Sequence, residues 1–193
     1  MAEGDAKRRR SIRLPAYDYR WPGAYFVTVC TKNRECLFGD VRDGNIVPNE
    51  FGRIVESSWA NIPIHFPFVS LDAFVLMPNH VHGVLVLTEV ERDAVGARHA
   101  LPLQREPLRR FQKPPAESLS SVIGSFKSAS TRQINLLRGT PGASVWQRNY
   151  YEYVIRNEQD LLAIRQYIRD NPVRWDQDEE NPERKKRGVG SVV

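Results

Sequence analysis

Residues 74–88, FVLMPNHVHGVLVLT, decide the architecture of this 193-residue chain. Two apolar, β-branched runs flank Pro78-Asn79, a dipeptide that is typical of a turn. We therefore predict a strand over residues 66–77, a break at the dipeptide, and a second strand over residues 80–88 that forms a hairpin with the first. The second run is apolar on both faces, which is the pattern of a central strand covered on both sides.

The segments on either side of this hairpin extend the pattern to an α+β fold. Residues 25–31 (YFVTVCT) predict an earlier strand, and residues 145–155 predict a fourth. Helices are predicted after Asn49, Ser118 and Asn157, because each of these side chains can cap a helix. The order β-α-β-β-α-β predicts a ferredoxin-like antiparallel sheet, and one further helix is added at its C-terminal end.

The charge of the chain favours an anionic partner. It has 28 Lys and Arg against 23 Asp and Glu, a net charge of +5, and basic side chains gain affinity by releasing counterions from phosphates. We predict a basic N-terminal arm over residues 1–20 and a single domain over residues 21–175. Within that domain, residues 89–116 are predicted to be a basic, mobile linker, and residues 176–193 a disordered tail.

Several classes of protein are not expected. No segment approaches the roughly 18 consecutive apolar residues of a membrane-spanning helix. No apolar stretch follows the basic start, so a secretory signal is not expected. Two cysteines without a CxxC pair argue against a disulfide framework and a cysteine-based zinc site. We therefore expect a cytoplasmic protein.

His80 and His82 are the first candidates for chemistry. Residues i and i+2 of a strand project from one face, so both imidazoles can bind one cation. The alternative is two ordinary polar positions at a strand edge, although histidine is unexpected in so apolar a run. A metal site needs at least a third ligand, so the pair is incomplete alone.

The last helix offers a second pair, Tyr167 and Asn171. Their i, i+4 spacing places them on one helical face, at the flank of the apolar stripe. The alternative interpretation is a half-buried packing tyrosine and an asparagine that ends the helix before Pro172. Three other tyrosines compete for a catalytic role, although packing or DNA contact suits their place near a strand end better: Tyr150, Tyr151 and Tyr153.

Together these motifs resemble the single-tyrosine HUH transposases, in particular the REP-associated tyrosine transposases of bacteria. The resemblance covers about residues 9–175. It rests on RRSIRLPAYDYRWPGAYFVTVCT, NEFGRIV, FVLMPNHVHG, IGSFKS, VWQRNYYEYVIRNE and YIRDNPVRW. The order of FVLMPNHVHG and YIRDNP is the specific feature, since either motif alone carries less information.

The resemblance implies a ferredoxin-like HUH domain that cleaves single-stranded DNA beside short hairpins. It implies that His80 and His82 are metal ligands, that Tyr167 is the nucleophile, and that Asn171 completes the metal site. The product would be a 5′-phosphotyrosine. The family implies Mg²⁺ or Mn²⁺, and two imidazoles with an amide oxygen make Mn²⁺ the better compromise. The protein would be a monomer or a homodimer.

Basic side chains are the candidates for contacts with single-stranded hairpin DNA. Arg8, Arg9 and Arg10 can hold the backbone of a hairpin stem, although a merely soluble arm is an equal alternative. Lys127 and Arg132 can face phosphates, although a solvated helix face also explains such charges. Arg148 lies beside the tyrosine cluster of residues 150–153 and is a further candidate.

Three hypotheses about function follow. The first is a metal-dependent DNA endonuclease and strand transferase. The second is a hairpin-binding protein with the same fold and little catalysis, and the intact set of His80, His82 and Tyr167 argues against it. The third is a metallohydrolase for small molecules. The basic segments and the lack of a clear carboxylate base make it the weakest of the three.

Overall fold

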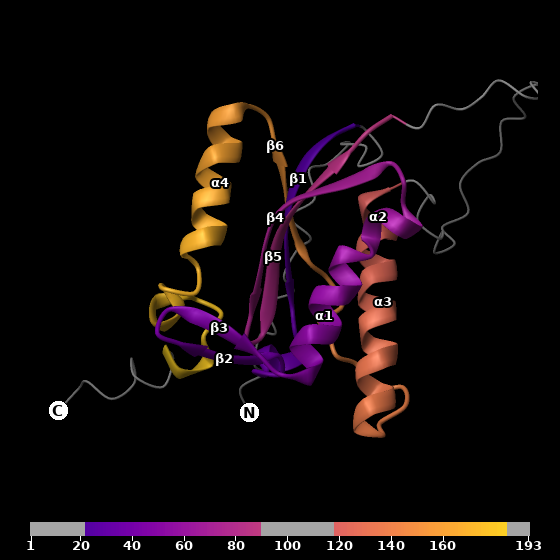
Figure 1. Cartoon of the computed structure of the whole chain (residues 1–193), viewed down its shortest axis with the longest axis vertical. Coiled ribbons are helices and arrows are strands. Elements are labelled where there is room, and N and C mark those ends of the chain that lie inside the picture. The colour runs from indigo at the N-terminus through magenta and orange to yellow at the C-terminus, as the bar shows by residue number, and fades with distance from the viewer. Residues whose placement is uncertain (1–21, 90–117, 185–193) are drawn as a thin grey trace, which may run out of the picture.

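A computed structural model describes residues 22–89 and 118–184 (Figure 1). Its centre is a four-stranded sheet in the order β4-β5-β1-β6, and all neighbouring strands are antiparallel. The strands are β1 (Gly23–Cys30), β4 (Val69–Met77), β5 (His80–Leu87) and β6 (Tyr151–Ile155). β5 is a central strand, as its two-sided apolar pattern predicts.

The longer helices lie between and after these strands. They are α1 (Glu50–Ala60), α3 (Leu119–Arg138) and α4 (Glu158–Asp170). Each begins at its predicted cap, because the side chains of Asn49, Ser118 and Asn157 each accept a hydrogen bond from the backbone three residues on. The main sheet and these helices follow the order β-α-β-β-α-β-α. The predicted α+β, ferredoxin-like sheet with an added C-terminal helix is therefore confirmed.

The two faces of the sheet have different covers (Figure 1). α1 and α3 pack together on one face, and α4 lies across the other. The alternation of a strand supplies apolar side chains to both: Val81 and Leu85 of β5 join the core beneath α1 and α3, whereas Val84 joins the cluster beneath α4.

The core under α1 and α3 is centred on Trp59. Its ring stacks on Phe74 with 5.0 Å between centroids and meets Phe126 of α3 edge-on at 5.3 Å. A Cβ atom at position 83 would overlap the six-membered ring of Trp59. Gly83 therefore allows the indole to lie directly on β5.

α4 is attached to the sheet in two ways. Its predicted apolar stripe packs on Phe26 and Val84 through Leu161, Ile164 and Ile168. At the edge strand, Asp72 accepts two hydrogen bonds from Arg165, with Nε to Oδ1 at 2.8 Å and a terminal nitrogen to Oδ2 at 2.5 Å. This bidentate ion pair holds the middle of α4 against β4.

A small hairpin precedes α1 and was not predicted. β2 (Gly39–Arg42) and β3 (Asn45–Pro48) pair around the Asp43-Gly44 turn, whose residues have φ angles of 51° and 72°. The sequence analysis did not identify these strands, because four-residue strands show too little alternation. The turn lies against Val173, just after α4.

The fourth strand is shorter than predicted. Residues 145–150 do not extend β6, and only Trp146 pairs there, in an isolated bridge with Thr31. The indole nitrogen of Trp146 donates a hydrogen bond to Ser130 of α3 at 3.0 Å. This buried hydrogen bond attaches the bridge residue to α3, and residues 147–150 interrupt the pairing between the bridge and β6. The second strand also begins later than predicted, at Val69, because α2 (Ile62–His65) and a turn precede it.

The C-terminal segment differs from the prediction, whereas two other predicted segments are not described. The predicted arm at residues 1–20 and the linker at residues 89–116, except Glu89, lie outside the described residues. Residues 176–184, which we predicted to be part of a disordered tail, instead bond to the domain through Glu180, which pairs with Arg34 at 2.6 Å. In the part of the chain that the structure describes, no helix has the length and apolarity needed to span a bilayer.

Candidate metal and nucleophile site

His80 and His82 project from β5 toward α4, on the face opposite Val81 and Gly83. Both are buried, at 0% and 3% exposure. Their Nε2 atoms are 3.0 Å apart. Two nitrogen ligands at about 2.1 Å from one cation are separated by roughly this distance when they subtend a right angle. The predicted convergence of the two imidazoles is therefore present.

The outer nitrogen of each imidazole is held by a neighbour. Nδ1 of His80 donates to Oδ1 of Asn79 at 2.8 Å, because the amide nitrogen of Asn79 already donates to backbone carbonyls of Arg34 and Glu180. This arrangement leaves the lone pair of His80 on Nε2, facing His82. Such an outer hydrogen bond orients a histidine ligand and sets its tautomer.

His82 has an adaptable partner. Its Nδ1 lies 2.8 Å from Oγ1 of Thr28, the residue directly opposite it on β1. A hydroxyl can donate or accept, so His82 can present either a proton or a lone pair at Nε2. In the first case it donates to His80, and in the second it can ligate a cation.

Both imidazoles are neutral near physiological pH. Burial, followed by the charge of Arg34, lowers the pKa of His80 to about 3. Burial, followed by the proximity of His80, lowers the pKa of His82 well below its usual value. Neutral imidazole is the form that binds metals, so the site does not need to lose protons before it takes up a cation.

Asn171 follows α4 and lies in the same site. It is 3% exposed, and its Oδ1 has no hydrogen-bond partner among the described residues. Its amide interacts with both His80 and Tyr167. A buried amide oxygen without a partner is costly, and coordination of a cation would remove that cost.

Asp178 is a further donor that the sequence analysis missed. Its Oδ2 lies 3.9 Å from Nε2 of His80, and one donor atom from each of His80, His82 and Asp178 lies within 4.8 Å of the others. The set of two imidazole nitrogens, one amide oxygen and one carboxylate oxygen fits a divalent cation such as Mn²⁺. The residues present are therefore compatible with a divalent cation, which the family resemblance implies.

Tyr167 stands at the edge of this group. Its hydroxyl is 3.3 Å from Nε2 of His82, and its ring meets Phe26 edge-on with 6.0 Å between centroids. The side chain is 45% exposed and lines an open cleft of about 1240 Å³. Burial, followed by the charge of Asp178, raises the pKa of Tyr167. The ring is thus held by packing while the hydroxyl faces both the histidines and the cleft.

The sequence is similar to two proteins of Haemophilus influenzae, although no family model matches it. An uncharacterized protein is 42% identical over 171 residues, which cover 89% of this chain and 92% of that protein. A second protein, named as a REP-associated tyrosine transposase, is 28% identical over 158 residues, which cover 81% of this chain and 74% of that protein.

The fold is similar to that of a solved tyrosine transposase in complex with a REP hairpin. The TM-score is 0.53 over 93% of this chain and 77% of that chain, at 20% identity. The chain thus resembles REP-associated tyrosine transposases both in sequence and in fold.

The other predicted DNA contacts differ in how accessible they are to a ligand. Arg148 is exposed and lines the cleft beside Tyr167, and Arg132 is exposed on α3. Lys127 instead donates to the backbone carbonyls of Gln147 and Arg148, at 2.6 and 3.0 Å. Three more predicted contacts lie outside the described residues, namely Arg8, Arg9 and Arg10.

The sequence analysis missed three residues that contact the two histidines from other parts of the chain. Thr28 and Asn79 hold the outer nitrogens of the histidines, and Asp178 approaches from beyond α4. Thr28 was detectable only once the register of β1 against β5 was known. Asp178 lies in a segment of mixed charge and carries no local signal.

Proposed function

We propose that this protein cleaves and rejoins single-stranded DNA beside a hairpin, with Tyr167 as the nucleophile. The observation that carries the proposal is the 3.3 Å approach of the Tyr167 hydroxyl to Nε2 of His82, in a group of otherwise buried donors. His80, His82 and Asn171 would hold a divalent cation, and Asp178 adds a carboxylate. The hairpin substrate is inferred from the solved relative, which is bound to a REP hairpin.

The proposed step is a transesterification. Oη of Tyr167 attacks the phosphorus of one phosphodiester, the bond from phosphorus to the 3′ oxygen breaks, and the upstream strand leaves with a free 3′-OH. The downstream strand stays attached as a 5′-phosphotyrosine. Attack by a 3′-OH on this diester reverses the step and releases the tyrosine, so strands can be exchanged without ATP.

The phenol must lose its proton during this step. Only about 0.1% of an unperturbed tyrosine is ionised at neutral pH, and burial of Tyr167 lowers that fraction further. When bound, a divalent cation would favour the phenolate and neutralise charge on the phosphate oxygens. The ring contact with Phe26 fixes the direction of attack, so little reorientation is needed.

The proposal is tested by formation of a covalent adduct. Single-stranded oligonucleotides that carry REP-like palindromes from the host genome are incubated with the protein and Mn²⁺, and the products are separated on a denaturing gel. We expect a protein–DNA adduct from the natural protein and none from Tyr167→Phe, which removes only the hydroxyl. The DNA affinity of the variant should remain unchanged.

Tyr151→Phe is the matched control. Tyr151 lies on the face of the sheet that α4 covers, is 40% exposed and lines the same cleft as Tyr167. The two variants therefore lose the same hydroxyl group and differ only in its position. Tyr153→Phe and Tyr150→Phe should also retain the adduct. If Tyr167→Phe still forms the adduct and one of the three control variants does not, the nucleophile has been misassigned. Tight hairpin binding by the natural protein without any adduct would instead favour the hairpin-binding alternative.

A further inference from the structure

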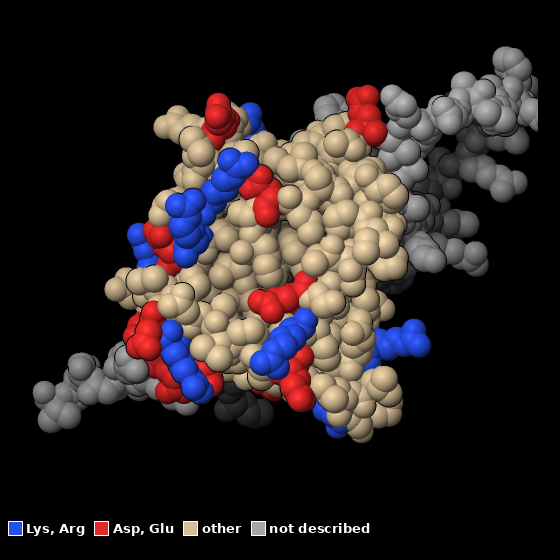
Figure 2. Space-filling view, viewed as in Figure 1, with Lys and Arg blue, Asp and Glu red and all other residues tan. Residues whose placement is uncertain are grey.

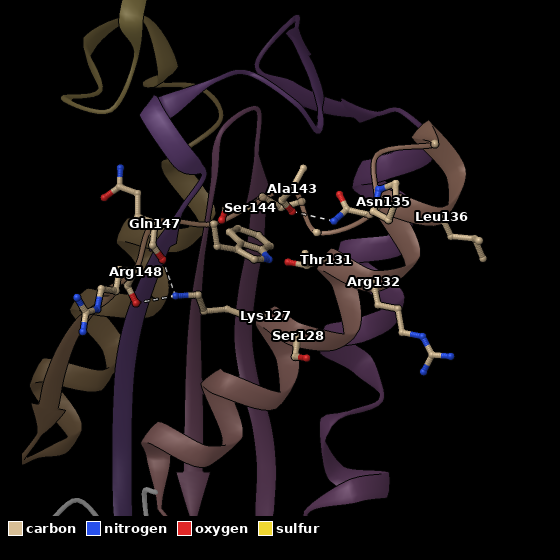
Figure 3. A pocket seen from close by; sticks show the side chains of 15 residues that line it. Lys127, Ser128, Thr131, Arg132, Asn135, Leu136, Ala143, Ser144, Gln147 and Arg148 are labelled. Carbon is tan, nitrogen blue, oxygen red and sulfur yellow. Dashed lines mark hydrogen bonds between the residues drawn. The ribbon is translucent and has the colours of Figure 1, made fainter. Parts of the chain in front are cut away.

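A second cavity lies next to the cleft, between α3 and the segment that leads to β6 (Figure 3). It has a volume of about 820 Å³ and a largely apolar lining that includes Leu136, Pro141 and Trp146. Hydroxyls of Ser128 and Thr131 on α3 also line it. This combination of apolar walls and a few polar groups is typical of a pocket for a small, partly apolar group.

The cavity and the catalytic cleft share a wall. Gln147 and Arg148 line both of them. Figure 3 shows Lys127 reaching from α3 to the backbone of these two residues, where its ammonium group donates to both carbonyls. Lys127 therefore supports the shared wall, and Arg132 and Arg148 are the cations left to meet a ligand.

The charge around the cavity is of one sign. The sequence has no Asp or Glu from Ser118 to Tyr151, and the cavity lining includes Arg132 and Arg148. The opposite side of the catalytic cleft is formed by the C-terminal segment, where Asp178, Glu179 and Glu180 line the cleft. In Figure 2, acidic side chains gather near that segment with basic ones among them, and most of the visible surface over α3 is uncharged. An anionic strand in the cleft would be directed toward α3.

We infer that this cavity holds one unpaired nucleotide of the strand that Tyr167 cleaves, and this inference rests on the proposed function. A base can stack on the apolar walls while its phosphates meet Arg132 and Arg148, which is how proteins bind single strands. A duplex stem does not suit the site, because its bases are paired inside a convex surface. The shared wall gives the strand a continuous path from the cleft into the cavity.

The test uses the full chain and a single-stranded oligodeoxynucleotide of mixed sequence in which 5-iododeoxyuridine replaces thymidine. After irradiation, we expect cross-links to α3 and to residues 139–148. Ser128→Trp places a large ring at the mouth of the cavity and should weaken single-strand binding about tenfold, because stacking of a base contributes that order of affinity. The same variant should bind a blunt hairpin without single-stranded arms as the natural protein does.

Ala129→Trp is the matched control, since residue 129 is the next exposed position on α3 and does not line the cavity. It should bind the single strand within about twofold of the natural protein. Equal binding by Ser128→Trp and Ala129→Trp would overturn the inference, and so would cross-links confined to other elements. Adduct formation is scored separately. Cross-links in the cavity without an adduct would contradict the proposed function alone, whereas an adduct without these cross-links would contradict this inference alone.

Discussion

The two faces of the central sheet carry different kinds of residue at adjacent positions. Gly83 of β5 faces α1 and α3, where it makes room for the ring of Trp59. The neighbouring residue, His82, faces α4. There it lies beside Tyr167 and near Asn171, whose buried Oδ1 has no hydrogen-bond partner among the described residues. The face under α1 and α3 is mainly a packed aromatic and aliphatic core, whereas the face under α4 also brings together imidazole, amide, hydroxyl and carboxylate groups. The comparison shows that one strand can supply the core and the chemistry at once, because its side chains alternate.

The largest expected effect lies on the α4 face. His82→Ala should reduce metal-dependent cleavage by roughly 1000-fold, because a bound cation contributes several kcal/mol to stabilisation of the transition state. The imidazole borders an open cleft, so its loss should change the melting temperature by only a few degrees. Cleavage assays in Mn²⁺ and thermal unfolding of the same preparation measure both effects. Undiminished cleavage would remove His82 from the metal site.

A substitution at the neighbouring residue, Gly83, should change stability much more than His82→Ala does. Gly83→Ala should destabilise the protein by about 3 kcal/mol, because the new methyl group overlaps the ring of Trp59 and the surrounding rings leave little space for it to move. Urea unfolding measures the loss.

Gly124→Ala is the control for this substitution. Position 124 is exposed on α3, and a Cβ there meets no atom within 4 Å. Alanine is the better helix former, so this variant should gain up to about 1 kcal/mol. A similar loss in both variants would show that Gly83 is not specifically required beneath Trp59.

The smallest expected effect is a dependence of stability on pH, which arises from His80 on the α4 face. His80 has a folded-state pKa of about 3 and an unfolded value near 6.5, so below pH 6.5 the unfolded chain binds a proton that the folded protein excludes. Stability of the metal-free protein should therefore fall as pH decreases from 6.5 toward 3. Between pH 7 and pH 5, this histidine should account for about 2 kcal/mol.

Urea titrations in EDTA at the two pH values measure the effect. In His80→Ala, the difference in unfolding free energy between pH 7 and pH 5 should be smaller by about 2 kcal/mol. Added Mn²⁺ should stabilise the natural protein more at pH 7 than at pH 5, because protons compete for the same nitrogens. An identical pH dependence in the natural protein and His80→Ala would contradict the assignment of a buried, neutral imidazole.

The parts of this molecule that follow local periodicity could be predicted from the sequence. The i, i+2 spacing of the histidines and the i, i+4 spacing of Tyr167 and Asn171 fixed which side chains share a face. The structure brings the four together. Their roles as ligands and nucleophile stay predictions, because geometry alone does not demonstrate catalysis.

The parts that depend on tertiary contacts could not be predicted. Trp146 donates a hydrogen bond to Ser130 of α3, a tertiary contact that no strand propensity reveals. Asp178 lies in a stretch of mixed charge that is typical of a solvated tail. Contacts of the next residues hold it near His80, because Glu180 pairs with Arg34 and its carbonyl accepts a hydrogen bond from Asn79. The charge composition of this segment predicts a solvated tail, whereas its position in the fold depends on a few specific contacts.

The four-residue interval between Tyr167 and Asn171 makes α4 a fixed-length spacer. Each residue turns a helix by about 100°, so one inserted or deleted residue between them would carry the tyrosine or the amide to another side of the helix. The relative direction of the two side chains therefore depends on the number of residues between them, and a change of length within this one turn of helix would separate the hydroxyl from the amide.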